Sequence, residues 1–313
     1  ELTADYGVGY EWENLPTGVV PVAGNVRKII GGSGLAVGTY NITAKAINYT
    51  GEDTETITLT VTAAPFANTK STNFEDQDYA GANAALLDPI LGRSGNGTGA
   101  SDAWTIMLWY KRSSVSTGQT IFYYGSSDVT NGAHIEIRQT NTSRLRIRYG
   151  SGNNYLQLSA PAGTLSANTW HQIVLTYDGG TTGASSANIS NYHSRFSLYV
   201  DGSAVTTSNS HGNYGWSGAI SGQNLRIGRF ASGNYLRGSR VDELAIWGSD
   251  QTTNLSNIYN SGSTQNLLSL STSPDHWWRM GDGDTFPTLQ DNVGSAHFVL
   301  YNMTTASIVT DAP

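Results

Sequence analysis

Hydrophobic and polar residues alternate strictly in two stretches near the beginning of the chain, at residues 38–48 and 53–61. Every second residue from Tyr40 to Ala46 is apolar, and so is every second residue from Ile57 to Val61. Because successive side chains of a strand point to opposite faces, this period indicates antiparallel strands with one buried face. We therefore predict a small β-sandwich domain at residues 1–64.

The rest of the chain is a series of short apolar-rich segments, each bounded by Gly, Asn, Ser or Asp. The segment DAWTIMLWYKR is apolar at nearly every central position, as expected for a strand that is covered on both faces. Further segments such as HIEIRQ and RFSLYV follow at the spacing that is typical of sandwiches and jelly rolls. A Pro-containing segment separates the two parts, so we predict a linker at residues 65–71 and a second β-sandwich at residues 72–313.

One segment, TTNLSNIYNSG, has helical spacing instead. Leu255, Ile258 and Tyr259 are three and four residues apart, and Gly262 is suited to cap the C-terminus of a helix. We predict a single helical turn there. The predicted fold class is therefore all-β, with two β-sandwiches in succession.

Composition narrows the range of partners. The 313 residues carry a formal net charge of -7, which argues against nucleic acid, because phosphate neutralisation requires clustered Lys and Arg. The nearest basic stretch, RLRIRYG, places Arg144, Arg146 and Arg148 on one face of a strand, a pattern that is typical of a solvated sheet face. The chain has no cysteine, which excludes disulfides and thiolate ligands. No apolar run approaches the roughly 18 residues of a membrane span, so we expect no membrane insertion.

Four motifs in the second part occur in a recognisable order. They are Trp170-His171 at the start of a strand, Tyr199-Val200-Asp201-Gly202 at a hairpin, Ile227-Gly228 at the end of a strand, and Asp242-Glu243 before an apolar strand. Together they resemble the laminin-G-like, concanavalin-A-like lectin superfamily, and the resemblance implies a jelly-roll β-sandwich. The hairpin motif also has a physical reason, because Asp-Gly tolerates the positive φ angles that a type I′ turn requires.

Two further resemblances bear on the role of the chain. The turn at Leu15-Pro16, the strand from Gly38 and the hairpin from Asn48 to Thr54 follow one another as in bacterial Ig-like domains, which implies a spacer at residues 1–64. The closing WWRMGDGD, from Trp277, resembles marine bacteriophage proteins, cyanophage-like in style, that are tail-fibre or virion surface proteins. That resemblance implies an extracellular position on the virion surface.

Catalytic motifs of the superfamily are missing. Its glucanases carry Glu-x-Asp-x-x-Glu on one strand, which directs the carboxylates into one groove. Here Glu136 stands alone, and Asp242 and Glu243 are adjacent, so a regular strand would point them to opposite faces. A Gly-x-Ser-x-Gly elbow is also absent, and His171 is expected to be a packed, hydrogen-bonded residue. We predict a non-enzymatic protein without catalytic residues.

The acidic closing run has two interpretations. Asp282, Asp284 and Asp291 offer carboxylate oxygens of the kind that calcium prefers, so calcium is the one cofactor that the sequence suggests. Phe286-Pro287, however, stands where an EF-hand-like loop would need a third oxygen ligand and a glycine. The alternative is structural: Trp277 or Trp278 is buried, Arg279 pairs with a carboxylate, the glycines form a tight turn, and the following HFVLYNM is the last strand.

Glycan contacts are sought among aromatic residues in polar loops, since their rings can stack on sugars beside amides that bind hydroxyls. The loops SNSHGNYGWSGAISGQN and FASGNYLRGSR supply the predicted ligand-binding residues, which are His211, Tyr214, Trp216, Asn234 and Tyr235. The competing interpretation is that these rings fold back on the sandwich or pack on a neighbouring subunit. Four tryptophans within apolar strands are expected in the core instead: Trp104, Trp109, Trp170 and Trp247.

Three roles remain open from the sequence. The first is a phage adhesin that binds a host cell-surface glycan through the loops of the second domain. The second is a purely structural capsid or tail protein whose partners are other virion proteins or further copies of itself as a homo-oligomer. The third is a secreted bacterial adhesin built from the same parts.

Overall fold

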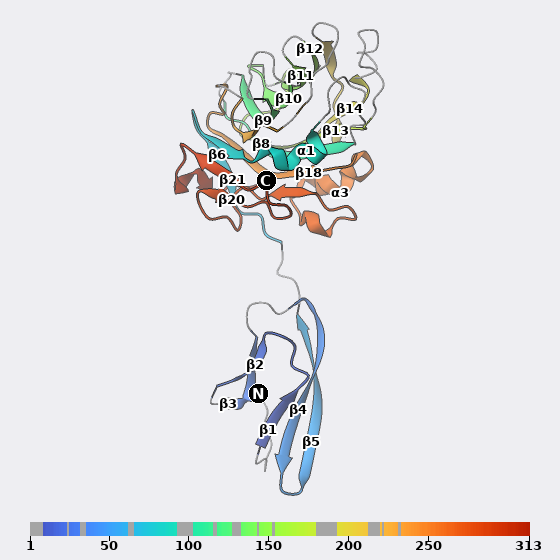
Figure 1. The fold of residues 1–313 in the computed structure, drawn as a ribbon, viewed down its shortest axis with the longest axis vertical. Coiled ribbons are helices and arrows are strands. Elements are labelled where there is room, and N and C mark those ends of the chain that lie inside the picture. Colours follow the sequence, from blue (N-terminus) through green and yellow to red (C-terminus); the bar gives the residue numbers. More distant parts are fainter. Residues whose placement is uncertain are drawn as a thin grey trace. The chain divides into compact units, whose positions relative to one another are not determined.

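The computed structural model describes residues 9–23, 25–31, 36–61, 66–92, 103–114, 118–126, 133–142, 144–151, 154–179, 193–211, 220, 222–230 and 233–313. The chain forms two compact units, Glu1–Phe66 and Ala67–Pro313 (Figure 1). None of the helices in the described part has the length and hydropathy that crossing a bilayer requires.

The described part of the first unit consists of two small antiparallel sheets, ordered β1–β4–β5 and β2–β3. Their strands are β1 (Gly9–Glu13), β2 (Val19–Val22), β3 (Asn25–Gly31), β4 (Gly38–Asn48) and β5 (Gly51–Val61). The side chain of Asn48 accepts hydrogen bonds from the backbone N–H groups of Thr50 and Gly51, which closes the β4–β5 turn. The alternating face of β4 is buried at Ile42, whereas Ile57 on β5 is 38% exposed. The Ig-like identity of this unit remains a prediction.

The second unit contains two large antiparallel sheets (Figure 1). The first has nine strands in the order β16–β12–β11–β10–β9–β17–β7–β21–β20. In chain order these strands are β7 (Tyr79–Ala82), β9 (Gln119–Gly125), β10 (Ala133–Gln139), β11 (Leu145–Ser151), β12 (Asn154–Ser159), β16 (Ser208–His211), β17 (Asn224–Ile227), β20 (Thr288–Leu289) and β21 (Phe298–Tyr301).

The second sheet has eight strands in the order β15–β14–β13–β8–β18–β6–β22, with β19 paired to β18. Its strands are β6 (Ser71–Phe74), β8 (Trp104–Lys111), β13 (Trp170–Tyr177), β14 (Phe196–Val200), β15 (Ser203–Ala204), β18 (Ser239–Trp247), β19 (His276–Trp278) and β22 (Ile308–Val309). The β14–β15 hairpin turns at Asp201 and Gly202, whose φ angles are +50° and +71°. The predicted turn with two positive φ angles is therefore confirmed.

An apolar core lies between these two sheets, to which Phe122 of β9 and Leu108 of β8 both contribute. Strand β8 is also buried on its outer side, because helix α3 (Leu255–Tyr259) lies against that side. There the rings of Trp109 and Tyr259 stack with their centroids 6.3 Å apart. This explains why β8 is apolar on both faces, and the predicted jelly-roll β-sandwich is confirmed.

Helix α3 occupies the segment with helical spacing, as predicted, but it ends at Asn260 rather than at Gly262. Asn260 adopts the left-handed conformation with φ of +47°, a region in which asparagine is tolerated better than most residues. A second short helix, α1 (Asp88–Leu91), and several 3₁₀ turns accompany it. The nearly all-β architecture therefore contains more helical turns than the one that the sequence predicts.

The closing motif is part of the sandwich. Trp277 and Trp278 are buried in β19, and Arg279 pairs with Glu243 at 3.4 Å, which confirms the structural interpretation. The segment HFVLYNM forms β21, but the prediction that it is the last strand was wrong, because β22 comes after it and pairs with β6. The prediction for Trp170 was wrong: it is half-buried, since it begins β13 and its indole N–H reaches the Asp311 carboxylate at 3.2 Å.

Candidate functional site

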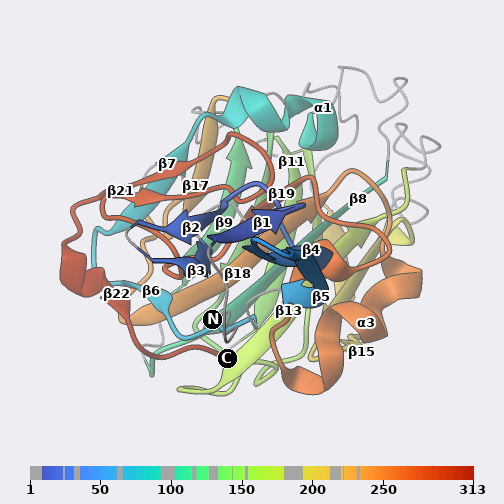
Figure 2. The same ribbon diagram turned by 90° about the horizontal axis from the view of Figure 1, so that it is seen from below.

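Strands β17, β7 and β21 lie side by side and expose one face of the nine-stranded sheet (Figure 2). The register sets Arg226 opposite Gly81 and Gly81 opposite Val299. Neighbouring residues on these strands, such as Leu225 and Phe298, belong to the core. Because side chains alternate along a strand, Arg226, Gly81 and Val299 lie on the outer face.

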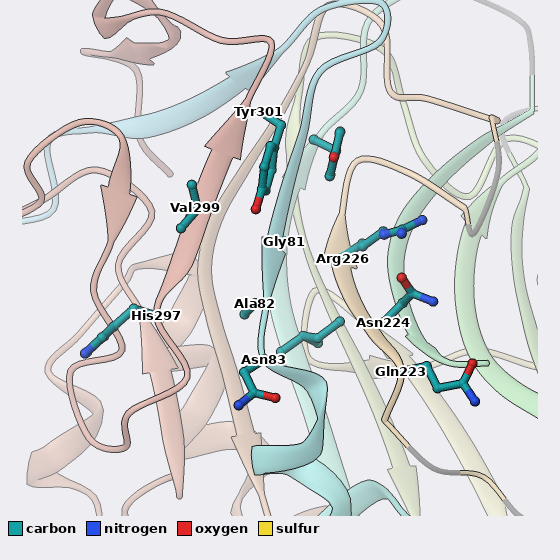
Figure 3. A pocket seen from close by; sticks show the side chains of 11 residues that line it. Gly81, Ala82, Asn83, Gln223, Asn224, Arg226, His297, Val299 and Tyr301 are labelled. Atoms are coloured by element: carbon teal, nitrogen blue, oxygen red, sulfur yellow. The ribbon is translucent and has the colours of Figure 1, made fainter. Parts of the chain in front are cut away.

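A pocket of about 300 Å³ opens on this outer face (Figure 3). It is lined by residues of three strands and their flanks, namely Tyr79, Gly81, Ala82, Asn83, Gln223, Asn224, Leu225, Arg226, His297, Val299 and Tyr301. Gly81 keeps its floor open, because a Cβ atom there would lie 3.3 Å from the ring of Tyr301 and 3.6 Å from that of Tyr79. The pocket therefore depends on the absence of a side chain at Gly81.

Four planar side chains form a continuous stack beside the pocket. The rings of Tyr301 and Tyr79 are parallel, with centroids 4.7 Å apart and an interplanar angle of 9°. The guanidinium of Arg229 lies 4.8 Å from the Tyr79 ring and 5.3 Å from the Tyr235 ring. We call these four residues, Tyr301, Tyr79, Arg229 and Tyr235, the stacked ladder. Tyr301 at one end is 43% exposed, so it offers an aromatic surface to solvent.

Polar groups complete the pocket. Within the described residues, Nδ2 of Asn224 is buried without a hydrogen-bond partner. The backbone N–H of Asp291 donates to Nδ1 of His297 at 2.9 Å, so the neutral ring carries its proton on Nε2, at the rim of the pocket. Burial and the nearby charge of Arg229 lower the pKa of Arg226, although a guanidinium stays charged at neutral pH. Exposed aromatic surface with hydrogen-bond donors around it suits a polar ligand that bears ring C–H groups.

The structure describes only part of the predicted ligand-binding set. Tyr214, Trp216 and the side chain of His211 lie outside the described residues. Asn234 is exposed with φ of +50°, and its carbonyl accepts the backbone N–H of Thr120. Tyr235 is half-buried at the end of the stacked ladder, so it is the one predicted residue that the described structure places near the pocket.

Tyr79 and Tyr301 are not among the ligand-binding residues predicted from the sequence. The sequence FVLY contains a signal for Tyr301, because side chains alternate along a strand. Phe298 and Leu300 are buried, whereas Val299 and Tyr301 are exposed on the other face of β21. A tyrosine on the outer side of a strand is a possible ligand contact. Its partner Tyr79 is far away in the sequence, so their stacking required the pairing of β7 with β21.

The three carboxylates proposed for calcium accept hydrogen bonds from the protein. Asp282 accepts from the backbone N–H groups of Thr69 and Lys70, and Asp284 from those of Gly281 and Gln290. Asp291 accepts from four backbone N–H groups and contacts Nδ1 of His276 at 2.6 Å. Among the described residues, no three His, Cys, Asp or Glu side chains form a group that could hold a metal ion. The predicted calcium site is untested, and a cation here would have to displace these donors.

Asp242 and Glu243 do not follow the regular strand that the sequence analysis assumed. A β-bulge interrupts β18 between Asp242 and Ala245, and Glu243 has φ of +47°. Asp242 lies opposite Trp109, which faces helix α3. Glu243 accepts the indole N–H of Trp277 on the same side of the sheet, so the expectation that they point to opposite faces was wrong. Both are almost fully buried, with 0% and 2% of their surface exposed, so a substrate cannot reach them.

Burial raises the pKa of both carboxyl groups. Burial raises that of Glu243 to about 7, although Arg279 and a hydrogen bond from Trp277 act against it. Burial and the charge of Glu243 raise the pKa of Asp242 well above its ordinary value, although Asn68 donates to it at 2.8 Å. These are properties of an enclosed structural cluster.

A Ser-His-Asp arrangement occurs on the second sheet. Oγ of Ser166 lies 2.8 Å from Nε2 of His171, whose Nδ1 lies 2.7 Å from the Asp201 carboxylate. The backbone N–H of Ser166 also donates to Nε2 at 3.1 Å, so the nitrogen that would act as a base already accepts a backbone hydrogen bond. Asp201 in turn accepts the N–H of Gln172. The cluster fixes the turn before β13, and His171 is the hydrogen-bonded residue that the sequence predicts.

Comparison with solved structures finds matches of low identity and low TM-score. The CBM40 domain of the Ruminococcus gnavus IT-sialidase, bound to α2,3-sialyllactose, is 13% identical, and the match covers 62% of this chain and all of that one with a TM-score of 0.40. A heptameric SAP-like pentraxin from Limulus polyphemus is 13% identical over 80% of this chain and 97% of its own, with a TM-score of 0.43. The NanB sialidase of Streptococcus pneumoniae is 14% identical over 69% and 32%, with a TM-score of 0.41. No curated protein sequence matches the chain significantly.

The sequence itself matches a family model. The model is described as the concanavalin A-like lectin/glucanases superfamily, and it matches residues 91–254. The matched region includes all eleven strands from β8 through β18 and covers just over half of the chain. The chain therefore belongs to the concanavalin A-like lectin/glucanases superfamily.

Proposed function

We propose that this protein binds glycans without catalysing their cleavage, through the pocket on the outer face of β17, β7 and β21. The observation that carries the proposal is the stacked ladder, which ends in the exposed ring of Tyr301 beside the pocket. An exposed ring stacks on the C–H face of a sugar, while side-chain donors such as Nδ2 of Asn224 bind its hydroxyls.

The absence of a catalytic role is part of the same proposal. Most glycoside hydrolases use two carboxyl groups that face each other across an accessible groove. No Asp or Glu is among the residues that line the pocket. Asp242 and Glu243, which the bulge does bring together, are buried beneath the C-terminal segment. These observations support binding rather than hydrolysis.

A glycan array tests the proposal with the full chain and two variants. Tyr301→Ala removes the exposed end of the stacked ladder, and we expect it to weaken glycan binding at least tenfold while the melting temperature changes little. The matched control is Tyr49→Ala, because Tyr49 is 95% exposed on the first unit. Equal binding by Tyr301→Ala and the wild type would refute the pocket as the site.

The finer role that we propose is that of an adhesin on a virion surface, and it is supported by the sequence resemblance of the closing WWRMGDGD. In this role Tyr235 adds a contact from the end of the stacked ladder, and Tyr214 and Trp216 stay ligand contacts predicted from the sequence. Antibodies against the chain, used in electron microscopy of the source particles, should label their surface. Labelling of bacterial cells instead of particles would support the secreted bacterial adhesin.

A structural role is the second candidate, and one observation favours it. Val299 and Tyr301 are both exposed on β21, and apolar residues on an exposed face also suit contact between copies of the chain. Light scattering separates the two roles. If the wild type is a homo-oligomer and Tyr301→Ala dissociates it, the structural role is supported. A monomer that binds glycan would support the adhesin role.

A further inference from the structure

The nine-stranded sheet reverses the charge balance of the chain. The whole sequence has 24 acidic and 17 basic residues. The nine strands of this sheet contain four arginines, no lysine, no aspartate and a single glutamate, Glu136. All four arginines, at positions 138, 146, 148 and 226, belong to strands near the middle of the sheet. An acidic protein has therefore concentrated positive charge on one sheet.

The strand register places these arginines on the same outer face as the pocket. Residues directly opposite each other in neighbouring antiparallel strands point to the same face. One such row crosses five pairs of strands, and its members are Arg226, Tyr123, Glu136, Arg148, Gln157 and Ser210. Arg138 and Arg146 lie two residues further along their strands, opposite each other, and so share this face. Arg229 joins it through its contact with Tyr79.

Two groups of arginines result, and the fully buried Tyr123 lies between them. Arg226 and Arg229 flank the pocket, while Arg138, Arg146 and Arg148 lie beyond Tyr123. The ring of Phe230 packs edge-on against Tyr123, with centroids 5.0 Å apart. Arg226 and Arg148 are three strands apart, or about 14 Å at the usual strand spacing of roughly 4.8 Å. A ligand that meets both groups must therefore be longer than a single sugar.

Three of these arginines, Arg138, Arg146 and Arg229, form no salt bridge within the described part of the chain, although the charge of Glu136 favours the charged form of Arg138. Arg138 and Arg146 form a like-charged pair directly across two strands, an arrangement that opposes folding. Among the described residues, the buried Nε atoms of Arg146 and Arg229 have no hydrogen-bond partner. All three are half-buried rather than fully solvated, which corrects the expectation of a solvated face around Arg146.

We propose that this face binds an acidic polysaccharide, whose carboxylate or sulfate groups recur along the chain and meet the two arginine groups in turn. The inference rests on the proposed glycan binding and adds its ligand class. A planar guanidinium donates two parallel hydrogen bonds to a carboxylate or sulfate, and half-burial strengthens each of them. The pocket and the stacked ladder then hold one sugar ring of the same polymer.

Four probes separate the contributions of charge and sugar. Polygalacturonate and its carboxyl-reduced form share one backbone, and dextran sulfate and dextran share another. We expect the wild type to bind the acidic member of at least one pair at least tenfold more tightly than its neutral partner, and increasing NaCl to weaken that binding. Preference for polygalacturonate identifies carboxylates as the recognised groups, and preference for dextran sulfate identifies sulfates.

The decisive variant is the double substitution Arg138→Gln/Arg146→Gln. It should weaken binding to the preferred acidic polymer at least tenfold without lowering the melting temperature, because it removes a like-charged pair. Arg27→Gln/Lys28→Gln, on the exposed β3 of the first unit, removes the same charge and should bind as the wild type does. A stable double variant that retains wild-type binding would overturn the proposal.

The outcomes also distinguish this inference from the proposed function. Equal binding to acidic and neutral partners, with loss of both in Tyr301→Ala, would overturn the acidic ligand and leave glycan binding intact. No binding to any probe or to the glycan array would refute both. Binding of a single-stranded oligodeoxynucleotide as tight as that of the acidic polymer would overturn the assignment to saccharides.

Discussion

The indole N–H of Trp277 donates to the carboxyl group of Glu243 at 2.6 Å, and both side chains are buried. This bond joins the closing segment of the chain to the bulge in β18. Arg279, two residues later, adds an ion pair to the same carboxyl group at 3.4 Å. The closing motif therefore contacts the eight-stranded sheet through Glu243, a carboxyl group whose pKa is raised to about 7.

Glu243 should make stability depend on pH near neutrality. Its pKa is about 7 in the folded protein and 4.5 as an ordinary side chain, so the folded state binds the proton more tightly. The resulting stabilisation is fully present below about pH 4.5 and is lost as the pH rises through 7. We expect the urea midpoint to fall between pH 5 and pH 8, and Glu243→Gln to reduce this fall. Parallel pH profiles of the wild type and the variant would contradict the assignment.

Asp291 should have the opposite pH dependence. Burial would raise its pKa, but hydrogen bonds from His276 and from backbone N–H groups outweigh burial and lower the pKa to about 2. Its stabilisation is present above the ordinary value of 3.8 and is lost as the pH falls towards 2. At pH 7, Asp291→Ala should cost about 3 kcal/mol in urea unfolding, because several buried donors lose their acceptor.

Asp76→Ala is the control for that measurement. Asp76 forms a salt bridge with Arg237 in which both side chains are about half exposed, so its loss should cost less than about 1 kcal/mol. A similar cost for both variants would show that the buried hydrogen bonds of Asp291 add nothing beyond an exposed charge.

Gly202→Ala should destabilise the β14–β15 hairpin. A Cβ atom at this position, where φ is +71°, would lie 2.6 Å from the ring of Tyr259, so the turn or helix α3 must shift. We expect a loss of about 3 kcal/mol in thermal or urea unfolding. Gly163→Ala is the matched control, because φ is +78° there but the space around the new Cβ is empty, and it should cost only about 1 kcal/mol. Equal losses would exclude the contact with Tyr259 as the cause.

Calcium should leave the melting temperature unchanged. The carboxylates of Asp282, Asp284 and Asp291 already accept hydrogen bonds from backbone N–H groups, and a bound cation would have to displace these donors. Differential scanning fluorimetry with EDTA, and then with excess calcium, measures the effect. A melting temperature that falls with EDTA and recovers with calcium would instead establish a calcium site.

Features set by neighbouring residues could be predicted from the sequence. The Asp201-Gly202 turn is one, since its two positive φ angles depend on the residues themselves. The burial of Trp277 and Trp278 and the pairing of Arg279 are others, because a short apolar strand and a charge beside it restrict the possible arrangements. The jelly-roll class followed from several such segments in a familiar order.

The pocket could not be predicted in the same way. It depends on β7, β17 and β21, three strands that are far apart in the chain and become neighbours only in the folded sheet. Glu243 shows a second limit: strict alternation gave the wrong face, because one extra residue in a strand cannot be recognised from its letters. Arg146 shows a third limit. Its spacing predicted the correct face of the strand, but it could not predict that Arg146 is half-buried on that face.

The pairing of β22 with β6 joins the last strand of the second unit to its first. The carboxylate of Asp311, just after β22, accepts hydrogen bonds from the ammonium of Lys111 at 2.8 Å and from the indole N–H of Trp170 at 3.2 Å. The eight-stranded sheet therefore gains this edge strand only when β22 folds back against β6. Because the two paired strands are far apart in the sequence, this edge closes through a long-range contact, and we expect it to form late in folding.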